Sequence, residues 1–376
     1  MDKDLATGGG IEKSIVTIIE LLNQNGCDVY LLSLNKPRLG EIKRIYGKKI
    51  RLKEVYAPKL IKTLPNKELI YQFVALPLLI KMLQHVEFIL AVDCYFMLNF
   101  IPRSYPFLVY ELSVPYLPKN FLKRSIRCML FKISKPRKNI PIIAHSRFTG
   151  KQIWEVFGMR TAGTLYPPIS NYFFNCEARN KRNQIVHVGR FSPDKRIELS
   201  LYIMREVLEK SKDAVLYLIG ASSGKKSKRY ISHLKEIAED LKISDNIIIL
   251  EDVDIENLVK ILKESKIILS FQTEPESFNM SILEGMAAGC VPIVPKVRRG
   301  AWDEILDEGK YGFGFNTISE CAEVIIHLLN LNSSEFHNYS CKAIRRAQLF
   351  DEYAFKQNFL RILQNMGLKK LCVRVW

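Results

Sequence analysis

The stretch Phe271-Gln-Thr-Glu-Pro-Glu-Ser-Phe-Asn-Met-Ser-Ile-Leu-Glu-Gly-Met-Ala-Ala-Gly289 joins an apolar run to a segment of helical spacing through a polar turn. Residues 267–271 are apolar and follow polar residues, which predicts an internal strand of a parallel sheet. Pro275 ends regular strand pairing. Apolar residues then recur every three or four positions over residues 279–288, as on one helix face, and Gly289 suits the C-terminal end. The polar turn is therefore expected at the carboxyl end of a strand, where open α/β sheets bind ligands.

Two carboxylates mark this stretch. Glu276 lies on the turn, and Glu284 lies about one turn inside the expected helix. At about 1.5 Å of rise per helical residue, and a looser rise through the turn, they would sit roughly 12 to 15 Å apart. That separation is too long for one acid–base pair, but it suits a ligand with polar groups at both ends, near helix amides that favour anions. The alternative is a capping acid followed by a surface glutamate.

The sequence from Glu276 to Pro292 resembles the signature of glycosyltransferase family 4, which comprises retaining, nucleotide-sugar-dependent enzymes of the GT-B fold. The family pattern is an acid, small residues and then Leu-Glu-Ala-Met-Ala. Here the chain reads Glu276-Ser-Phe-Asn-Met-Ser-Ile-Leu-Glu284-Gly-Met-Ala-Ala-Gly-Cys-Val-Pro292. The resemblance implies that Glu284 holds the ribose hydroxyls. It implies that the donor sugar is held by Glu276 and the amides after it, those of Ser277, Phe278, Asn279 and Met280. Asn279 stands where the family often has glycine, and Gly285 stands where it has alanine.

Length and composition predict two α/β domains. The chain has 376 residues, of which 48% are hydrophobic, enough for a substantial core. Its eight cysteines form no Cys-x-x-Cys pair and match no histidine spacing, so neither a disulfide framework nor a zinc site is indicated, and we interpret them as buried thiols in a reducing compartment. We find no signal peptide, lipidation motif or apolar run of about 18 residues, and expect neither export nor a membrane-spanning helix.

Positive charge is concentrated in the first half. Residues 1–170 hold 26 Lys and Arg against 12 Asp and Glu, which accounts for +14 of the formal charge of +17. Residues 112–154 contain ten basic residues and no acid. Such a patch indicates an anionic partner, either nucleic acid or an anionic membrane surface.

Within this half, residues 121–133 combine apolar residues at helical spacing with surrounding lysines and arginines. A basic amphipathic helix of this kind can lie in a membrane interface, and the alternative is an ordinary helix with its apolar stripe in the core. The charge of the whole half favours the membrane, so we predict an anionic membrane surface as a partner through residues 119–138. Aromatic residues do not interleave with the basic run as a stacking surface needs, which argues against nucleic acid.

The amino terminus begins with a glycine loop, Thr7-Gly-Gly-Gly-Ile-Glu12, that leads into an amphipathic segment ending near residues 23–26. In family 4, an element such as Gly9-Gly10-Ile11-Glu12 follows the first strand, and its glycine amides approach the donor phosphates. Residues 1–6 are too few and too polar for a buried central strand. Two interpretations remain open: the start has been placed downstream of the true one, or the sheet lacks its first strand.

Strand and helix patterns alternate along the rest of the chain, which favours parallel sheets covered on both faces. The overall prediction is a GT-B fold of two Rossmann-like domains whose sheets face a central cleft. We expect an acceptor-binding domain at 1–170, a nucleotide-sugar-binding domain at 171–350 and a terminal helix at 351–376 that crosses back to the first domain. Strands are expected within 27–33, 88–92, 106–112, 140–146, 164–169, 184–188, 214–220, 246–250 and 291–295, with a linker at 170–184.

A second motif follows the strand expected at 184–188. Arg190 and Lys195 lie five apart after Gly189, at the carboxyl end of that strand, where two cations can bind one diphosphate. The alternative is two solvated basic residues. Family 4 proteins show the same pair here. In the family, the next strands contribute a glycine turn, Gly220 here, and backbone contacts to the base near Asp252 and Val253.

The acceptor side departs from the family pattern. Many members carry a histidine in the segment that corresponds to Tyr110-Glu-Leu-Ser-Val-Pro115, and this chain has none there. Glu111 or Ser113 could substitute in polarity, but neither is assigned a catalytic role. His145 is the nearest histidine in sequence, and we interpret it as a buried residue at a strand end.

These observations predict transfer of a hexose, of mannose or glucose type, with retention from a nucleotide diphosphate sugar to a lipid-linked glycan or lipid acceptor. Glu276, Arg190 and Lys195 are the expected catalytic residues: Glu276 orients the sugar, and the cations with the helix amides neutralise the diphosphate, so that no metal and no further cofactor are needed. The expected location is cytoplasmic, peripheral on the cytoplasmic face of the membrane. A sugar-nucleotide epimerase of the same fold remains an alternative, and a nucleic-acid-binding protein is a less favoured one.

Overall fold

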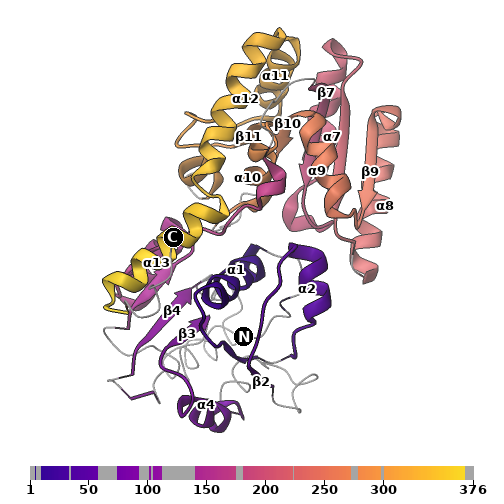
Figure 1. Cartoon of the computed structure of the whole chain (residues 1–376). Coiled ribbons are helices and arrows are strands. Elements are labelled where there is room, and N and C mark those ends of the chain that lie inside the picture. Colours follow the sequence, from indigo (N-terminus) through magenta and orange to yellow (C-terminus); the bar gives the residue numbers. More distant parts are fainter. Residues whose placement is uncertain are drawn as a thin grey trace. The chain divides into compact units, whose positions relative to one another are not determined.

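The computed structural model describes residues 5, 10–33, 35–57, 74–92, 101–102, 105–111, 140–174, 181–222, 224–271, 278–297 and 300–368. The chain divides into two units, each with its own core (Figure 1). The first unit comprises Met1–Pro168 and Tyr353–Trp376, and the second comprises Ile169–Glu352. The last helix therefore contributes most of its length to the first unit.

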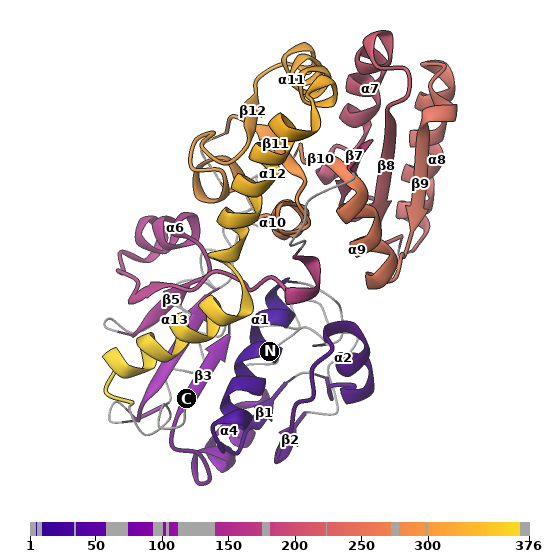
Figure 2. The same ribbon diagram turned by 45° about the horizontal axis from the view of Figure 1, so that its top comes forward.

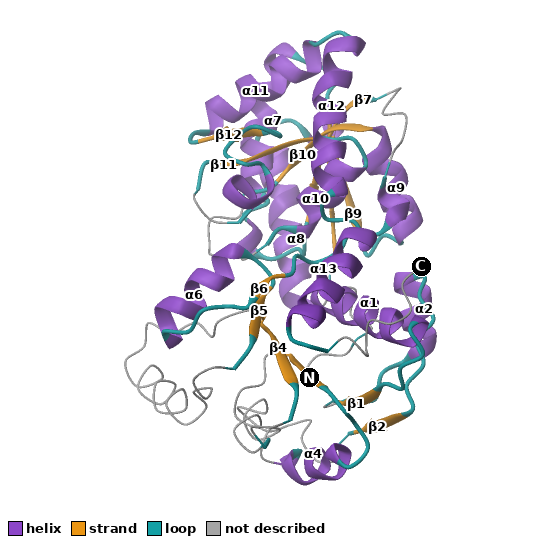
Figure 3. Cartoon of the chain, turned by 60° about the vertical axis from the view of Figure 1, so that its left-hand side comes forward, coloured by secondary structure: helices purple, strands orange, loops and turns teal. Residues whose placement is uncertain are grey.

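The described residues of the first unit form two parallel sheets. One has the strand order β1-β2 and the other the order β3-β4-β5-β6. Figure 3 shows the β1–β2 pair apart from β4, β5 and β6. The elements are α1 (Gly10–Gln24), β1 (Tyr30–Leu32), α2 (Leu39–Tyr46), β2 (Glu54–Tyr56), α4 (Leu76–Leu83), β3 (Ile89–Val92), β4 (Phe107–Glu111), β5 (Ile142–Ala144), α6 (Arg147–Phe157), β6 (Gly163–Thr164) and α13 (Glu352–Asn365).

Local sequence explains the ends of α6. Ser146 caps its first turn by accepting a hydrogen bond from the Thr149 amide, and Gly158 ends the helix in the left-handed conformation. His145 lies immediately before this cap, 4% exposed, with its ring Nδ1 3.3 Å from the Thr149 hydroxyl. The interpretation of His145 as a buried residue at a strand end is confirmed.

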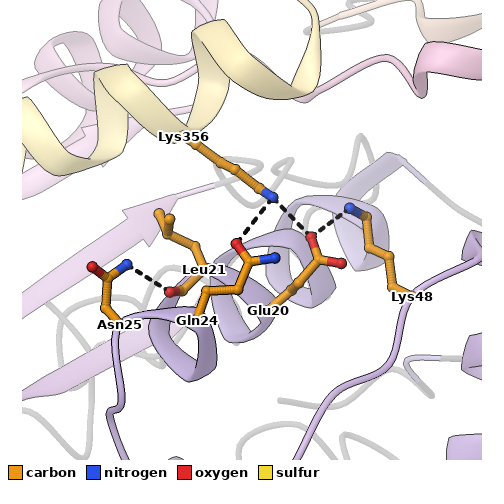
Figure 4. A network of polar contacts seen from close by, with 6 residues as sticks. All are labelled: Glu20, Leu21, Gln24, Asn25, Lys48 and Lys356. Atoms are coloured by element: carbon orange, nitrogen blue, oxygen red, sulfur yellow. Dashed lines mark hydrogen bonds and ion pairs between the residues drawn. The ribbon is translucent and has the colours of Figure 1, made fainter. Parts of the chain in front are cut away.

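The terminal helix α13 is held to α1 by apolar packing and by one polar network. Phe355, Phe359 and Leu363 are buried in a cluster with residues of α1, β4 and β5. At the surface of that cluster, Glu20 of α1 accepts hydrogen bonds from Lys48 at 2.8 Å and Lys356 at 2.9 Å (Figure 4). Burial raises the pKa of Glu20, but the two lysines outweigh it, so the net pKa lies below its usual value.

The second unit is built on one six-stranded parallel sheet with the order β12-β11-β10-β7-β8-β9. Figure 2 shows its strands with helices on either side. The elements are η2 (Asn171–Phe173), β7 (Arg182–Val188), η3 (Pro193–Lys195), α7 (Glu198–Lys210), β8 (Val215–Gly220), α8 (Gly224–Asp240), η4 (Ser244–Asn246), β9 (Ile247–Glu251), α9 (Ile255–Glu264), β10 (Ser265–Leu269), α10 (Met280–Ala287), β11 (Val291–Pro295), η5 (Ala301–Ile305), β12 (Phe313–Phe315), α11 (Ile318–Asn330) and α12 (Ser333–Gln348).

The order of these strands creates a reversal in the middle of the sheet. The chain lays β8 and β9 on one side of β7, and then places β10, β11 and β12 on the other side. The strands β7 and β10 are direct neighbours in parallel register, with Ile267 opposite Ile185 and Leu269 opposite His187. Such a switch point leaves a crevice at the carboxyl ends of the two strands, because their connections leave in opposite directions.

The region between the two units differs from the sequence prediction. Residues 170–184 were expected to be a linker, but η2 lies there and β7 already begins at Arg182. Lys181 stands just before that strand, partly buried, and its Nζ donates to the carbonyls of Ala288 at 2.7 Å and Leu262 at 3.2 Å. These carbonyls lie at the carboxyl ends of helices α9 and α10, where the helix dipole favours a positive charge. The strand expected at 164–169 is also shorter, because β6 is limited to Gly163–Thr164.

Other boundaries agree within a few residues. The strand predicted at 267–271 is β10, and the helix predicted at 279–288 is α10, after which Gly289 takes a positive φ of 84°. Within the described residues, no strand precedes α1. The basic segment 119–138 lies outside the described residues. Of the described cysteines, Cys290 and Cys321 are buried, while Cys27 and Cys341 are partly exposed.

Candidate functional site

The switch point between β7 and β10 gathers most of the residues that the sequence singled out. The loop after β7 carries Gly189, Arg190 and Lys195, and the segment after β10 leads to the amino end of α10. The neighbouring strand β8 ends at Gly220. These loops leave adjacent parallel strands at one edge of the sheet, which is the edge where ligands bind in such folds.

Two glycines bring the loops after β7 and β8 into backbone contact. A Cβ atom placed on Gly220 would lie 1.8 Å from the carbonyl oxygen of Gly189, a distance that no side chain tolerates. The Gly189 amide donates to the Ile219 carbonyl at 2.9 Å, and the Phe191 amide donates to the Ala221 carbonyl at 3.1 Å. Backbone therefore forms the floor of the site, and its polar groups can approach a ligand closely.

The two predicted cations, Arg190 and Lys195, differ in exposure and in their contacts. Arg190 is exposed, and its guanidinium lies 3.8 Å from the Asp194 carboxylate, with 73% of the arginine side chain accessible. Lys195 is half-buried, and its side-chain carbons pass over Gly189. An exposed ion pair of this length is weak. Arg190 can therefore exchange Asp194 for a phosphate at little cost, while Lys195 is already held over the loop.

The amino end of α10 is capped by Asn279, which stands where glycosyltransferase family 4 often has glycine. Asn279 is 7% exposed, and its Oδ1 accepts from the Ile282 amide at 3.3 Å and from the Ser281 hydroxyl at 2.9 Å. Its Nδ2 donates to Ser270 at 2.8 Å, which ties the helix start to the end of β10. The side chain of Asn279 is thus engaged within the protein, and only its backbone is left for a ligand. Phe278 beside it is also buried, with its ring 5.6 Å from that of Phe350.

Glu284 lies about one turn into α10, half-buried, as the spacing predicted. Tyr172 of η2 lies near enough for Glu284 and Glu352 to affect its hydroxyl: burial raises the pKa of Tyr172, and these two carboxylates raise it further. Tyr172 was not singled out from the sequence, because only the fold brings η2 against α10. The next residue, Gly285, faces β10, and an added Cβ there would lie 2.5 Å from the side chain of Ile268. The glycine lets α10 pack closely on β10.

The loop after β9 is organised by Asp252. Its carboxylate accepts from the Ser222 amide at 3.1 Å and from the Ser222 hydroxyl at 2.8 Å, and these hydrogen bonds lower the pKa of Asp252. Asp252 also has a positive φ of 50°, and its amide donates to the Gly220 carbonyl at 2.9 Å. Val253 follows, partly buried, at the same sheet edge. Asp252 thus connects the loops after β8 and β9. It also fixes the backbone near Val253, which the family resemblance assigns to contact with the nucleotide base.

His187 underlies the same region. It is 2% exposed near the carboxyl end of β7, its Nδ1 lies 2.8 Å from the Ser200 hydroxyl, and its ring packs against Phe271. Burial lowers the pKa of His187 to about 3, with a further contribution from Lys195, so the ring is neutral at pH 7. It supports the floor of the site rather than acting as an acid or base.

The described arrangement includes the predicted site residue Met280 and shows none of four others. Gly9, Glu276 and Ser277 lie outside the described residues. Gly10 begins α1 in the first unit. Met280 is the first residue of α10, partly buried at the switch point. The roles assigned to Glu276, Arg190 and Lys195 in catalysis stay predictions.

Among the residues that the structure describes, no three His, Cys, Asp or Glu side chains are grouped as a metal ion would require. No described helix combines the length and apolar character needed to cross a bilayer. The absence of a metal requirement stays a prediction.

Comparison with known proteins points to the second unit. Residues 169–346 match the family Glycosyl transferases group 1. Two curated proteins named GDP-Man:Man(3)GlcNAc(2)-PP-Dol alpha-1,2-mannosyltransferase are similar. That of Dictyostelium discoideum is 22% identical over 238 residues, which cover 59% of this chain and 46% of that protein. That of Caenorhabditis elegans is 24% identical over 242 residues, which cover 60% and 50%. The chain thus spans about half the length of the curated relatives it matches.

Solved structures resemble the chain over nearly its whole length. Sucrose-phosphate synthase from Thermosynechococcus elongatus has a TM-score of 0.72 at 16% identity and covers 98% of both chains. Anabaena HepE, solved with UDP and glucose, has a TM-score of 0.71 at 14% identity, covering 97% of this chain and 98% of that one. These likenesses confirm the predicted fold, a GT-B architecture of two Rossmann-like units with parallel sheets.

Proposed function

We propose, from the premise that the chain carries a domain of the family Glycosyl transferases group 1, that it transfers a hexose with retention from a nucleoside diphosphate sugar to a lipid-linked glycan. This proposal rests on the grouping of the predicted residues at the β7–β10 switch point of the second unit. There the backbone contact of Gly189 with Gly220, the two cations and the start of α10 lie at the carboxyl ends of neighbouring strands. A nucleoside diphosphate sugar presents a matching series of groups: a diphosphate for the cations and amides, and hydroxyls for a carboxylate.

The diphosphate would lie over Gly189. Lys195 is already positioned above that glycine, and Arg190 is held only by a weak exposed ion pair. Two cations on one diphosphate stabilise the negative charge that develops as the sugar leaves. In this arrangement Arg190 and Lys195 do the work that a divalent cation does in other enzymes, which supports a metal-independent reaction.

The ribose and the sugar would be held by different carboxylates. We assign the ribose hydroxyls to Glu284, which lies inside α10 with Tyr172 near it. Glu276, on the preceding turn, would orient the sugar. Glu284→Gln should therefore weaken free nucleoside diphosphates and nucleotide sugars alike, whereas Glu276→Gln should spare free nucleoside diphosphate and reduce turnover. Equal loss of free nucleotide in both variants would show that this division of roles is wrong.

Mannose and a lipid-linked acceptor are favoured by the curated relatives, whose names give GDP-mannose as donor and a dolichol-linked glycan as acceptor. The +14 charge of residues 1–170 supports a cytoplasmic protein that is peripheral on an anionic membrane surface. We assign that contact to residues 119–138. Wild-type protein should sediment with vesicles containing anionic lipid, be released by high salt, and lose most of the binding when Lys123, Arg124 and Arg127 are changed to Gln. Equal binding to neutral vesicles would contradict the assignment.

Product analysis tests the proposed transfer itself. The protein is incubated with GDP-mannose or UDP-glucose, with and without a polyprenyl diphosphate-linked oligosaccharide. We expect the oligosaccharide to gain one hexose, with the anomeric configuration of the donor retained. An isomerised nucleotide sugar formed without any acceptor would instead support the epimerase of the same fold.

A further inference from the structure

A small pocket lies in the second unit at the amino ends of β11 and β12. Val291 and Phe313, the first residues of those strands, contribute to its wall. The rest of the wall comes from the loop at 309–312 and from Tyr339 and Lys342 of α12. The strands of this sheet are parallel, and the predicted donor residues lie at the carboxyl ends of β7, β8 and β10. The pocket therefore lies at the opposite edge of the sheet, and the proposed hexose transfer does not use it.

Two glycines keep side chains out of this pocket. Gly309 has a φ of 100°, and a Cβ added to Gly312 would lie 2.7 Å from the Pro292 carbonyl oxygen. A side chain at either position is therefore unfavourable. In the same turn, Asp307 and Glu308 also take left-handed conformations, with φ of 50° and 52°. Backbone strain of this kind is costly in residues that carry a side chain, and it is concentrated at functional sites.

Two lysines and two tyrosines line the pocket. Lys310 and Lys342 are both exposed. The Nζ atom of Lys310 lies 5.2 Å from the centre of the Tyr311 ring, and that of Lys342 lies 5.9 Å from the centre of the Tyr339 ring. Contacts between cations and rings are weak at exposed positions. Both ammonium groups can therefore turn toward an anionic ligand at little cost in lost interactions.

The acids of the turn do not cancel this positive charge. Asp307 lies 3.8 Å from Lys310, and an exposed ion pair of this length contributes little, while Glu308 is also exposed. Arg346 of α12 adds a third cation. Its guanidinium lies 5.0 Å from the centre of the Tyr311 ring and donates to two carbonyls of η5 at 2.7 and 2.8 Å. Arg346 thus holds that ring in place and leaves the cations around the pocket in excess of these two acids.

We propose that this pocket binds the phosphate group of a small phosphate monoester, such as a hexose phosphate. Lysine ammonium groups bind phosphate oxygens as compact point charges. The two tyrosines offer the rest of the ligand flat apolar faces and hydroxyl groups. The pocket has a volume of about 150 Å³. That volume equals about five water molecules of about 30 Å³ each, which suits a phosphate with a few further atoms and is too small for a whole nucleotide.

Calorimetric titration with mannose 6-phosphate tests the site. The parent protein for this titration carries Arg190→Ala and Lys195→Ala, so that the cations of the proposed donor site cannot bind the phosphate group. The result is then independent of whether the chain transfers a hexose. We expect the parent protein to bind one equivalent of mannose 6-phosphate and no neutral mannose. Absence of binding by the folded parent protein, or equal binding of mannose, overturns the proposal.

Two matched pairs of substitutions in that parent locate the binding. One variant changes Lys310 and Lys342 to Ala. The control changes Lys235 and Lys260, which are exposed on α8 and α9, and removes the same charge. We expect the pocket variant to bind mannose 6-phosphate at least about tenfold more weakly, and the control to bind it as the parent does. Equal weakening in both variants, or none in the pocket variant, overturns the assignment to this pocket.

Two further arms separate the sources of a phosphate group. Inorganic phosphate should compete with mannose 6-phosphate for the parent protein but bind more weakly, because it lacks the contacts with the tyrosine rings. Equal affinity of inorganic phosphate overturns the part assigned to the rings. Vesicles containing phosphatidic acid present the same group on a lipid. Binding to these vesicles that requires Lys310 and Lys342, without binding of mannose 6-phosphate, overturns a soluble ligand in favour of a lipid headgroup.

Discussion

The sheets of the two units differ in continuity. In the second unit, six described strands form one parallel sheet, in which β7, β8 and β10 end on the same side. In the first unit, a cavity lies between β1 and β3, and helices α1 and α4 pack against strands of both sheets. In a continuous sheet, the hydrogen bonds between neighbouring strands align the strand ends directly. A divided sheet must rely on helix packing and on polar contacts such as the one at Glu20.

The largest effect is expected at the glycine contact that aligns the second unit. Gly220→Ala places a methyl group where the Gly189 carbonyl lies, so the loops after β7 and β8 must separate. We expect a loss of more than about 3 kcal/mol in the free energy of unfolding, above the usual range for overpacking because the clash is with backbone. Chemical denaturation measures it. Gly40→Ala is the control, because nothing lies within 4 Å of a Cβ there, and it should be neutral or stabilising.

His187 gives the second unit a pH dependence. Its pKa falls from 6.5 to about 3 on folding, so the unfolded chain binds more protons between these values. The stability that neutral His187 contributes is complete above pH 6.5 and is lost progressively as the pH falls toward 3. Between pH 7 and pH 4, we expect a loss of roughly 3 kcal/mol from this residue, from 1.36 kcal/mol per pKa unit. His187→Asn keeps a polar group near Ser200 and should flatten this part of the stability profile; an unchanged slope would contradict the assignment.

The first unit should depend on the network at Glu20. Glu20→Gln removes the charge that Lys48 and Lys356 share, and it leaves two partly buried cations without their carboxylate. We expect a loss of about 1 to 3 kcal/mol, confined to the first unit. Because the pKa of Glu20 is lowered in the folded state, the contribution is present above the ordinary glutamate pKa of 4.5 and disappears as the pH falls below it. Glu41→Gln, whose ion pair with Arg44 is exposed, is the control and should have little effect.

Sequence reasoning reached much of the second unit because its signals are local. Three of these signals involve only residues that are close in the sequence: the apolar run of β10, the helical spacing of α10 and the glycine at position 289. Contacts between residues far apart in the sequence could not be predicted. Nothing local marks Gly220 as the partner of Gly189, or Lys181 as a cap for two helices, because those contacts join residues at least 31 positions apart.

Asn279 is an intermediate case. Its preference for helix N-caps could have identified it as the cap of α10, since asparagine is among the best residues at that position. The family pattern, which favours glycine there, drew attention to the difference instead. In the first unit, the cavity between β1 and β3 could not be predicted, because its walls come from segments that are far apart in the sequence.

The donor site in the second unit is tested most directly by calorimetric titration of GDP and UDP into four proteins: wild type, Arg190→Ala, Lys195→Ala and Lys210→Ala. Lys210 is the control, exposed at the far end of α7 from the glycine floor. We predict that wild type and Lys210→Ala bind one of the two nucleotides equally well. Each loop variant should bind it more weakly by about 1.5 to 3 kcal/mol. Unchanged affinity in both loop variants, or no binding of either nucleotide by folded wild-type protein, would contradict a donor site at the β7–β10 switch point.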